Sequence, residues 1–174
     1  MLELIIVIVV AGILAAVMIP RLERDNLREA ANQLVRHIQY TQHLAMVDDV
    51  YNAGDTNWYQ NRWMIDLCGT AYAVKRANST DTAEDPLTKR DINGTDNNIA
   101  ALGVSSIVFS GTTTDCKVVF DNLGRPYRMA GVPASPTGNM ITTDATITLN
   151  TGAGRSAVIN ITKETGFVKL TSLN

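Results

Sequence analysis

An apolar run at the beginning of the chain limits most strongly what this sequence can form. From Leu4 to Ile19 no side chain is charged or strongly polar. With Met1 and Leu2 ahead of it, the run just reaches the roughly 17–25 helical residues that cross a bilayer. A secretory signal peptide is the competing interpretation, but the run has no basic start and exceeds the usual apolar core of about 7–15 residues. We therefore expect a transmembrane or filament-core helix over 1–20.

A helical pattern continues beyond this run. Apolar residues recur at intervals of three, four or seven, which indicates one stripe of an amphipathic helix. The stripe consists of Leu27, Ala31, Leu34, Ile38 and Ala45, with Thr41 in the gap. We expect the amphipathic helix over 21–52. A helix from Met1 to about Val50 would be roughly 75 Å long at about 1.5 Å per residue, so half of it must find partners outside the subunit.

The periodicity changes from helical to alternating at about Asn61. Alternation over 63–68 and, most clearly, over 141–149 predicts strands, and 157–161 and 167–170 flank a Thr-Gly turn. One helical region followed by many strands predicts an α+β fold with antiparallel pairing. The expected architecture is a long N-terminal helix, hydrophobic in its first half and amphipathic in its second, packed on an antiparallel β-rich head over 53–174.

Glu3 is the one ionisable side chain at the start of the apolar run. A carboxylate at bilayer depth costs on the order of 2.5–3.5 kcal/mol on insertion scales, and less near the interface. One interpretation is that Glu3 marks the boundary where lipid headgroups begin. The other is that it meets a cation once the helix packs among its neighbours.

The segment ELIIVIVVAGILAAVMIP resembles the N-terminal segment of type IV pilins and of the pseudopilins of type II secretion. In that family an acidic residue, a hydrophobic run, a glycine and a proline follow one another at this spacing, and Glu3, Gly12 and Pro20 occupy these positions here. The resemblance covers about the first twenty residues. It implies processing by a prepilin peptidase, anchoring in the inner membrane, and assembly into a helical fibre on a pilus assembly platform. A weaker similarity links two later segments to the end of minor pseudopilins with a β-sandwich head. The segments are VVFDNLGRPY and RSAVINITKETGFVKL.

The resemblance assigns roles to three residues. In the family the glutamate is the fifth residue of the mature chain and contacts the terminal amine of an adjacent subunit, a role that carries over to Glu3. Since Glu3 is third here, we expect two residues, and any leader, to precede Met1. Pro20 lacks an N–H and crowds the preceding turn, while Gly12 is a weak point costing up to ~1 kcal/mol relative to alanine. We expect the helix to break between Gly12 and Pro20 in a fibre.

Two cysteines, Cys68 and Cys116, follow the membrane-type segment. An oxidising compartment would favour a disulfide between them. Two separate buried thiols are the alternative. No CxxC motif or Cys/His cluster is present, so a structural zinc site is not expected.

No pattern in the sequence indicates an enzyme. Motifs such as GxSxG, HExxH and the phosphate-binding P-loop are absent from the sequence. His37 and His43 are six residues apart, whereas a metal pair on a helix prefers a spacing of three or four. The segment 91–96 is a weak calcium pattern without the glutamate that closes an EF-hand loop, and a solvated loop is favoured. We expect neither a metal nor a cofactor.

Asn93 lies in an Asn-x-Thr sequon, two residues after Asp91. This resembles the extended acceptor sequence of some bacterial N-glycosylation systems. Asn93 is therefore a candidate glycosylation site, although unmodified asparagine is favoured unless the organism has the machinery. The net charge of −2 creates no field that would gather nucleic acid, which we do not expect as a partner.

The sequence thus predicts a structural subunit of a type IV pilus or pilus-like (pseudopilus) helical filament, a homopolymer formed through the hydrophobic helix. It would lie in the inner membrane before assembly and in a periplasmic or extracellular filament afterwards. The alternative is a membrane-anchored periplasmic or surface binding protein, or adhesin, that does not polymerise. Glu3 and Pro20 favour the polymer because a plain anchor needs neither.

Overall fold

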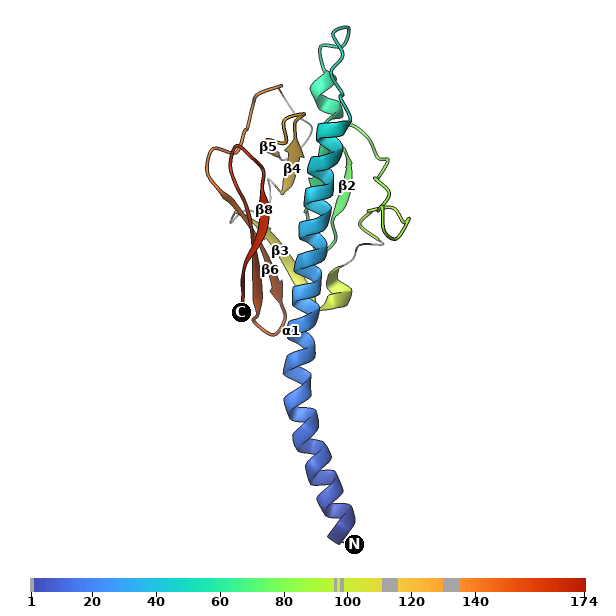
Figure 1. Ribbon diagram of the computed structural model, residues 1–174, viewed down its shortest axis with the longest axis vertical. Coiled ribbons are helices and arrows are strands. Elements are labelled where there is room, and N and C mark those ends of the chain that lie inside the picture. Colours follow the sequence, from blue (N-terminus) through green and yellow to red (C-terminus); the bar gives the residue numbers. More distant parts are fainter. Residues whose placement is uncertain (1, 96, 98, 111–115, 130–134) are drawn as a thin grey trace.

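The computed structural model describes residues 2–95, 97, 99–110, 116–129 and 135–174, and within the helix it describes side chains for 3–16 and 26–47. The helix is α1 (Leu2–Val47). Two short 3-10 helices follow it among the strands, η1 (Trp58–Asn61) and η2 (Ile99–Leu102). Figure 1 shows the strands gathered beside the second half of α1, while its first half extends away from them.

The described strands form two four-stranded antiparallel sheets. The first has the order β2-β1-β4-β5 and the second the order β3-β6-β7-β8. The strands of the first sheet are β1 (Trp63–Asp66), β2 (Ala73–Arg76), β4 (Lys117–Phe120) and β5 (Pro126–Met129). The strands of the second sheet are β3 (Val104–Phe109), β6 (Ala145–Thr151), β7 (Ser156–Ile161) and β8 (Val168–Leu173).

The core lies between α1 and the two sheets. Leu27, Leu34 and Ile38 are fully buried on the helix, at the spacing that the apolar stripe predicted. Ala31, Thr41 and Ala45 are buried on the same side, so the amphipathic stripe is confirmed. The helix contacts β1 and β4 of the first sheet and β6, β7 and β8 of the second. One helical stripe therefore closes the cores of both sheets.

The expected fold class, an α+β chain with a long N-terminal helix packed along its length on an antiparallel β head, is wrong. The helical side chains fall into two described stretches, 3–16 and 26–47, and burial occurs only in the second. The rest is a small domain made mostly of β-structure, divided into two sheets. The physical reason is that the short strands of the domain are already covered by 26–47, which leaves the first stretch no sheet to pack on.

Two element boundaries also differ from the sequence pattern. Helix α1 ends at Val47 rather than near residue 52. Just beyond this end, Asp49 Oδ1 accepts a hydrogen bond from Tyr51 N at 2.9 Å, which stabilises a turn in place of further helix. The strand predicted over 141–149 begins only at Ala145. Ile141 N instead donates to Pro126 O at 3.0 Å, so the start of this segment lies against the first sheet.

Two glycines with left-handed backbones form a matched pair. Gly166 (φ +65°) lies in the turn before β8, where a Cβ would collide with Gly124 O and lie 2.8 Å from Gln42 Nε2. That amide group already donates to Gly124 O at 2.8 Å and to Thr165 O at 2.7 Å. Gly154 (φ +76°) has nothing within 4 Å of its Cβ position. The two sites share backbone strain but differ in the space around them.

We expect Gly154→Ala to lower the free energy of unfolding by about 1–2 kcal/mol, the cost of a left-handed alanine. Gly166→Ala should lower it by a further ~1–3 kcal/mol because the methyl group overpacks the contact between α1 and the turn. Urea unfolding of the two variants, followed by circular dichroism, measures the difference. If both variants lost the same free energy of unfolding, the residues around Gly166 would accommodate the methyl group without an energetic cost.

Candidate functional site

The first described stretch of α1 exposes an apolar surface all around the helix. Nine large apolar side chains between residues 4 and 14 are 49–65% exposed. They are Leu4, Ile5, Ile6, Val7, Ile8, Val9, Val10, Ile13 and Leu14. We call these nine residues the apolar helix surface. Seven of them are consecutive, and seven residues make almost two helical turns, so no polar face interrupts the surface.

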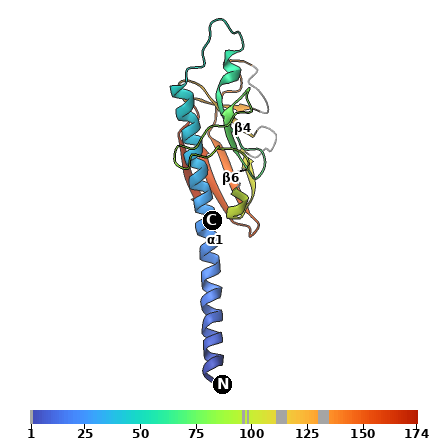
Figure 2. The same cartoon turned by 90° about the vertical axis from the view of Figure 1, so that its right-hand side faces the viewer.

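A helix that is apolar on every side is stable where all its sides are covered, in the core of a larger structure or in a membrane. Figures 1 and 2 show this part of α1 extending beyond the strands in two perpendicular views, with no other described element beside it. A contiguous exposed apolar surface of this kind marks an interaction site. No described element of the chain supplies that cover.

The three predicted assembly residues lie on this same helix. Glu3 is exposed and immediately precedes the apolar helix surface. Gly12 lies within it, and a Cβ there would meet nothing within 4 Å, so packing inside the chain does not require a glycine. Pro20 belongs to α1, but its side chain is outside the described residues. The predicted break between Gly12 and Pro20 concerns the assembled fibre and stays a prediction.

The described part of the chain contains no helix that is both long and apolar enough to span a membrane.

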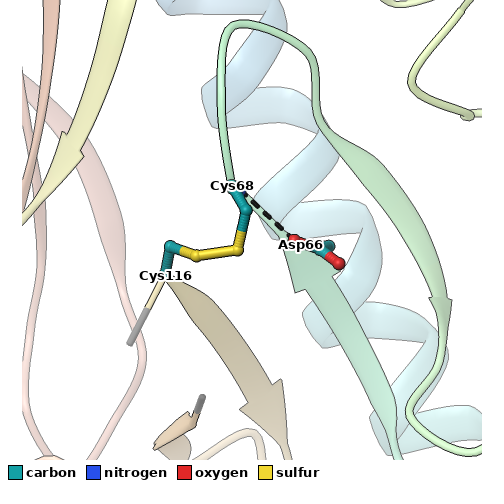
Figure 3. Close-up of side chains that lie close together, drawn as sticks. All are labelled: Asp66, Cys68 and Cys116. Atoms are coloured by element: carbon teal, nitrogen blue, oxygen red, sulfur yellow. Dashed lines mark hydrogen bonds between the residues drawn. A yellow bond between two sulfur atoms is a disulfide. The ribbon is translucent and has the colours of Figure 1, made fainter. Parts of the chain in front are cut away.

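Cys68 and Cys116 lie together, as the sequence predicted, and form a disulfide in the structure (Figure 3). Their Cα atoms are 5.3 Å apart. The pairing of β1 with β4 brings them together, because Cys68 follows β1, Cys116 precedes β4, and Leu67 N donates to Cys116 O at 3.0 Å. The bridge therefore joins the ends of two neighbouring strands.

Asp66 lies beside this disulfide, and the three residues bring possible metal-binding atoms within 4.8 Å of one another. Sulfur atoms bonded to each other cannot supply thiolate ligands. The Asp66 carboxylate is also compensated, since Lys75 Nζ lies 3.6 Å and Lys117 Nζ 3.7 Å from its Oδ2. This cluster is better explained as a structural ion-pair group beside the disulfide than as a metal site.

The two histidines of α1 have different surroundings. His43 is exposed, whereas His37 is buried. His37 Nδ1 is 2.7 Å from the Tyr72 hydroxyl, and His37 Nε2 is 3.6 Å from Asp85 Oδ2. Sequence reasoning did not find this group, because its members come from the helix and from two separate later segments.

Burial lowers the pKa of His37 and outweighs the Asp85 carboxylate, which acts in the opposite direction. Arg36 beside it lowers the pKa further. The folded protein therefore keeps His37 neutral at a pH where the unfolded chain, with a pKa near 6.5, is already protonated. Stability from this group is complete above pH 6.5 and is lost as the pH falls below it.

We expect the free energy of unfolding to decrease by up to about 1 kcal/mol between pH 6.5 and pH 5.5 because of His37. His37→Gln removes the titrating group and should flatten this dependence. His43→Gln, at the exposed histidine, should leave it in place. Urea unfolding across this range measures both, and the same slope in wild type and His37→Gln would exclude His37 as its source.

The candidate glycosylation site lies in the segment between β2 and η2. Asn93 is half-buried, and its Oδ1 accepts a hydrogen bond from Thr95 N at 2.8 Å. Asp91 and Thr95 are exposed, so the sequon borders the surface. Asp96, the last residue of the weak calcium pattern, is outside the described residues.

Comparison with known proteins adds no relative: no family model matches the chain, and no curated protein or solved structure is significantly similar to it.

Proposed function

We propose that this chain is a structural subunit of a helical filament of the type IV pilus or pseudopilus kind, and that it polymerises through the apolar helix surface. The observation that carries the proposal is the nine-residue apolar surface around α1, next to a domain that closes its own core without it. The core of the domain does not need such an extension, whereas assembly into a filament requires an apolar surface of this kind.

Copies of the same chain are the proposed cover for this surface. Full burial of one large apolar side chain contributes about 1.5–3 kcal/mol, so covering nine that are roughly half exposed contributes on the order of 10 kcal/mol. Each copy brings an identical surface, and helices that associate along their length cover one another. The first half of α1 also extends away from the domain, which leaves room for neighbouring helices around it (Figure 2).

The resemblance of the first twenty residues to type IV pilins supports the same proposal. Glu3, Gly12 and Pro20 follow one another at the spacing of that family. In a bundle of apolar helices, Glu3 would be an unpaired carboxylate unless a neighbour supplied a cation, and the proposed cation is the terminal amine of an adjacent subunit. Before assembly, the apolar helix surface would be held in the inner membrane. A prepilin peptidase and an assembly platform are the partners this route needs.

Electron microscopy of sheared surface filaments, with mass identification of the subunit, tests the proposal. Filaments in which peptides of this chain are identified, as a major or a minor component, would support it. Membrane fractions that contain the protein, from cells whose filaments lack it, would contradict polymerisation. They would favour the alternative of an anchored binding protein.

A further inference from the structure

A cavity of 220 Å³ opens beside the end of α1. Four aromatic residues line it, Tyr51, Trp58, Trp63 and Phe120, together with polar side chains that include Asp49, Arg62 and Asn122. We call it the aromatic cavity. The segment that follows α1, drawn in teal, lies at the end of the molecule opposite the N-terminus (Figure 1). The cavity is therefore remote from the apolar helix surface.

The two tryptophans of the cavity are held in place by charged neighbours. Trp63 Nε1 donates to Asp48 Oδ2 at 2.8 Å, and the Arg76 guanidinium donates to the same oxygen at 2.6 Å. Arg76 also stacks on the Trp63 ring, 5.4 Å from its centroid. These contacts fix one wall before any ligand binds, as in a preformed site.

Arg62 holds a second part of the lining in place. Its side chain is buried and stacks 5.1 Å from the centroid of the Trp58 ring and 5.0 Å from that of Tyr127. One of its terminal nitrogens donates to Pro136 O at 2.8 Å. Tyr51 stands edge-on to Trp58, with ring centroids 5.2 Å apart, and is 61% exposed. The cavity is thus lined by two indole rings that charged neighbours hold in place, and by the exposed phenol ring of Tyr51.

The chemistry of the walls narrows the class of ligand. A cation is disfavoured because each indole is already stacked by a guanidinium. An anion would meet the carboxylates of Asp48 and Asp49 as well as the guanidiniums of Arg62 and Arg76, so it would gain no net attraction. A wholly apolar ligand would strip water from the charged lining groups without replacing it. A neutral ligand with an apolar ring face and several hydroxyl groups fits both kinds of wall. The volume is below the ~300 Å³ at which drug-sized pockets begin, so the ligand is one small ring.

We propose that the aromatic cavity binds a single neutral pyranose unit of a carbohydrate. The apolar face of the sugar ring packs on the aromatic rings. Its hydroxyl groups donate to Asp49, accept from Arg62, and both donate to and accept from Asn122. This binding role does not depend on polymerisation. If the chain does form filaments, the proposal makes each subunit carry a carbohydrate site at the end of its domain opposite the filament helix.

The chain offers an internal probe for this proposal, because its only two tryptophans both line the cavity. We would titrate the full chain with glucose, galactose, mannose and N-acetylglucosamine to about 200 mM, a range that covers millimolar affinities. A polyoxyethylene detergent without a sugar headgroup would keep the apolar helix surface in solution. At least one of these sugars should cause a saturable change in tryptophan fluorescence.

Tyr51 provides the matched variants. Tyr51→Ala should weaken binding of that sugar about fivefold, because a stacking ring is lost from an exposed position that the fold does not need. Tyr51→Phe keeps the ring and should stay within about twofold of wild type. Leu87→Ala, at a residue that is 83% exposed and does not line the cavity, is the remote control. Near-ultraviolet circular dichroism would establish that each variant is folded.

Three results would overturn the proposal. The first is the absence of a saturable change with all four sugars. The second is a sugar response that Tyr51→Ala leaves unchanged, because binding would then lie elsewhere. The third is saturation by tetramethylammonium without saturation by any of the sugars, which would identify the cavity as a cation site.

Discussion

Replacing Glu3 by alanine is expected to reduce the yield of the proposed filaments about tenfold or more, while the domain stays folded and the variant fractionates with membranes as the wild type does. Glu3 is exposed in the subunit and contacts none of the buried core, so its loss should not affect folding. In the proposed filament it would be an acidic group among apolar helices, where pairing with a neighbour's amine sets the axial register. A pairing worth 1.4 kcal/mol at each interface already corresponds to about a factor of ten in association.

Glu29→Ala is the matched control for this experiment. Glu29 is also an exposed glutamate on α1, but it lies in the stretch that packs on the domain rather than beside the apolar helix surface. We expect this variant to form filaments at the wild-type level. Quantitative electron microscopy of sheared filaments, with immunoblots of membrane fractions, compares the two. A normal yield from Glu3→Ala would refute the role of Glu3, and equal losses from both variants would show a general sensitivity to charge.

Removing the disulfide is expected to lower the free energy of unfolding by ~4 kcal/mol. Cys68 and Cys116 are separated by 48 positions, and closing a loop of that length restricts the unfolded chain strongly. The variant to test is Cys68→Ser with Cys116→Ser, compared by urea unfolding with wild type under oxidising conditions. This loss is a large part of the 5–15 kcal/mol that stabilises an ordinary domain.

The reduced wild-type protein is the control, and it should unfold at nearly the same urea concentration as the double serine variant. Mass analysis without reductant checks the premise directly. If both thiols of the native protein could be alkylated after unfolding without reductant, the bridge would be absent and the predicted loss would not apply. If the double variant were as stable as the oxidised protein, the bridge would contribute nothing beyond the neighbouring strand pairing.

The sequence was informative where a feature depends on neighbouring residues. The apolar run and the change from helical to alternating periodicity are local patterns. The buried stripe of Leu27, Leu34 and Ile38 follows from helical geometry once the helix forms. Two cysteines allow only one bridge, so the partner of Cys68 was fixed by number, but two separate thiols stayed an alternative until the structure paired them.

The arrangement of the strands could not be predicted in this way. The strand β3 was not predicted, because Val104–Phe109 contains two serines and a weak alternation. It is stabilised by pairing with β6, about forty residues later. The division into two sheets depends on which strands meet across such distances, and the pattern of a single strand does not specify its partner.

The assembly surface and the aromatic cavity show the same contrast. The apolar helix surface could be read from the sequence because its residues are consecutive, and only its exposure needed the structure. The cavity could not be predicted from the sequence. Asp48, Trp63 and Arg76 come together only because α1 ends beside the paired strands β1 and β2. The sequence by itself determined the helix, its apolar stretch and the cysteine pair, because each is set by local spacing or by number. Only the tertiary structure decided the two sheets, the burial of His37 and the aromatic cavity, because each depends on contacts between segments far apart in the chain.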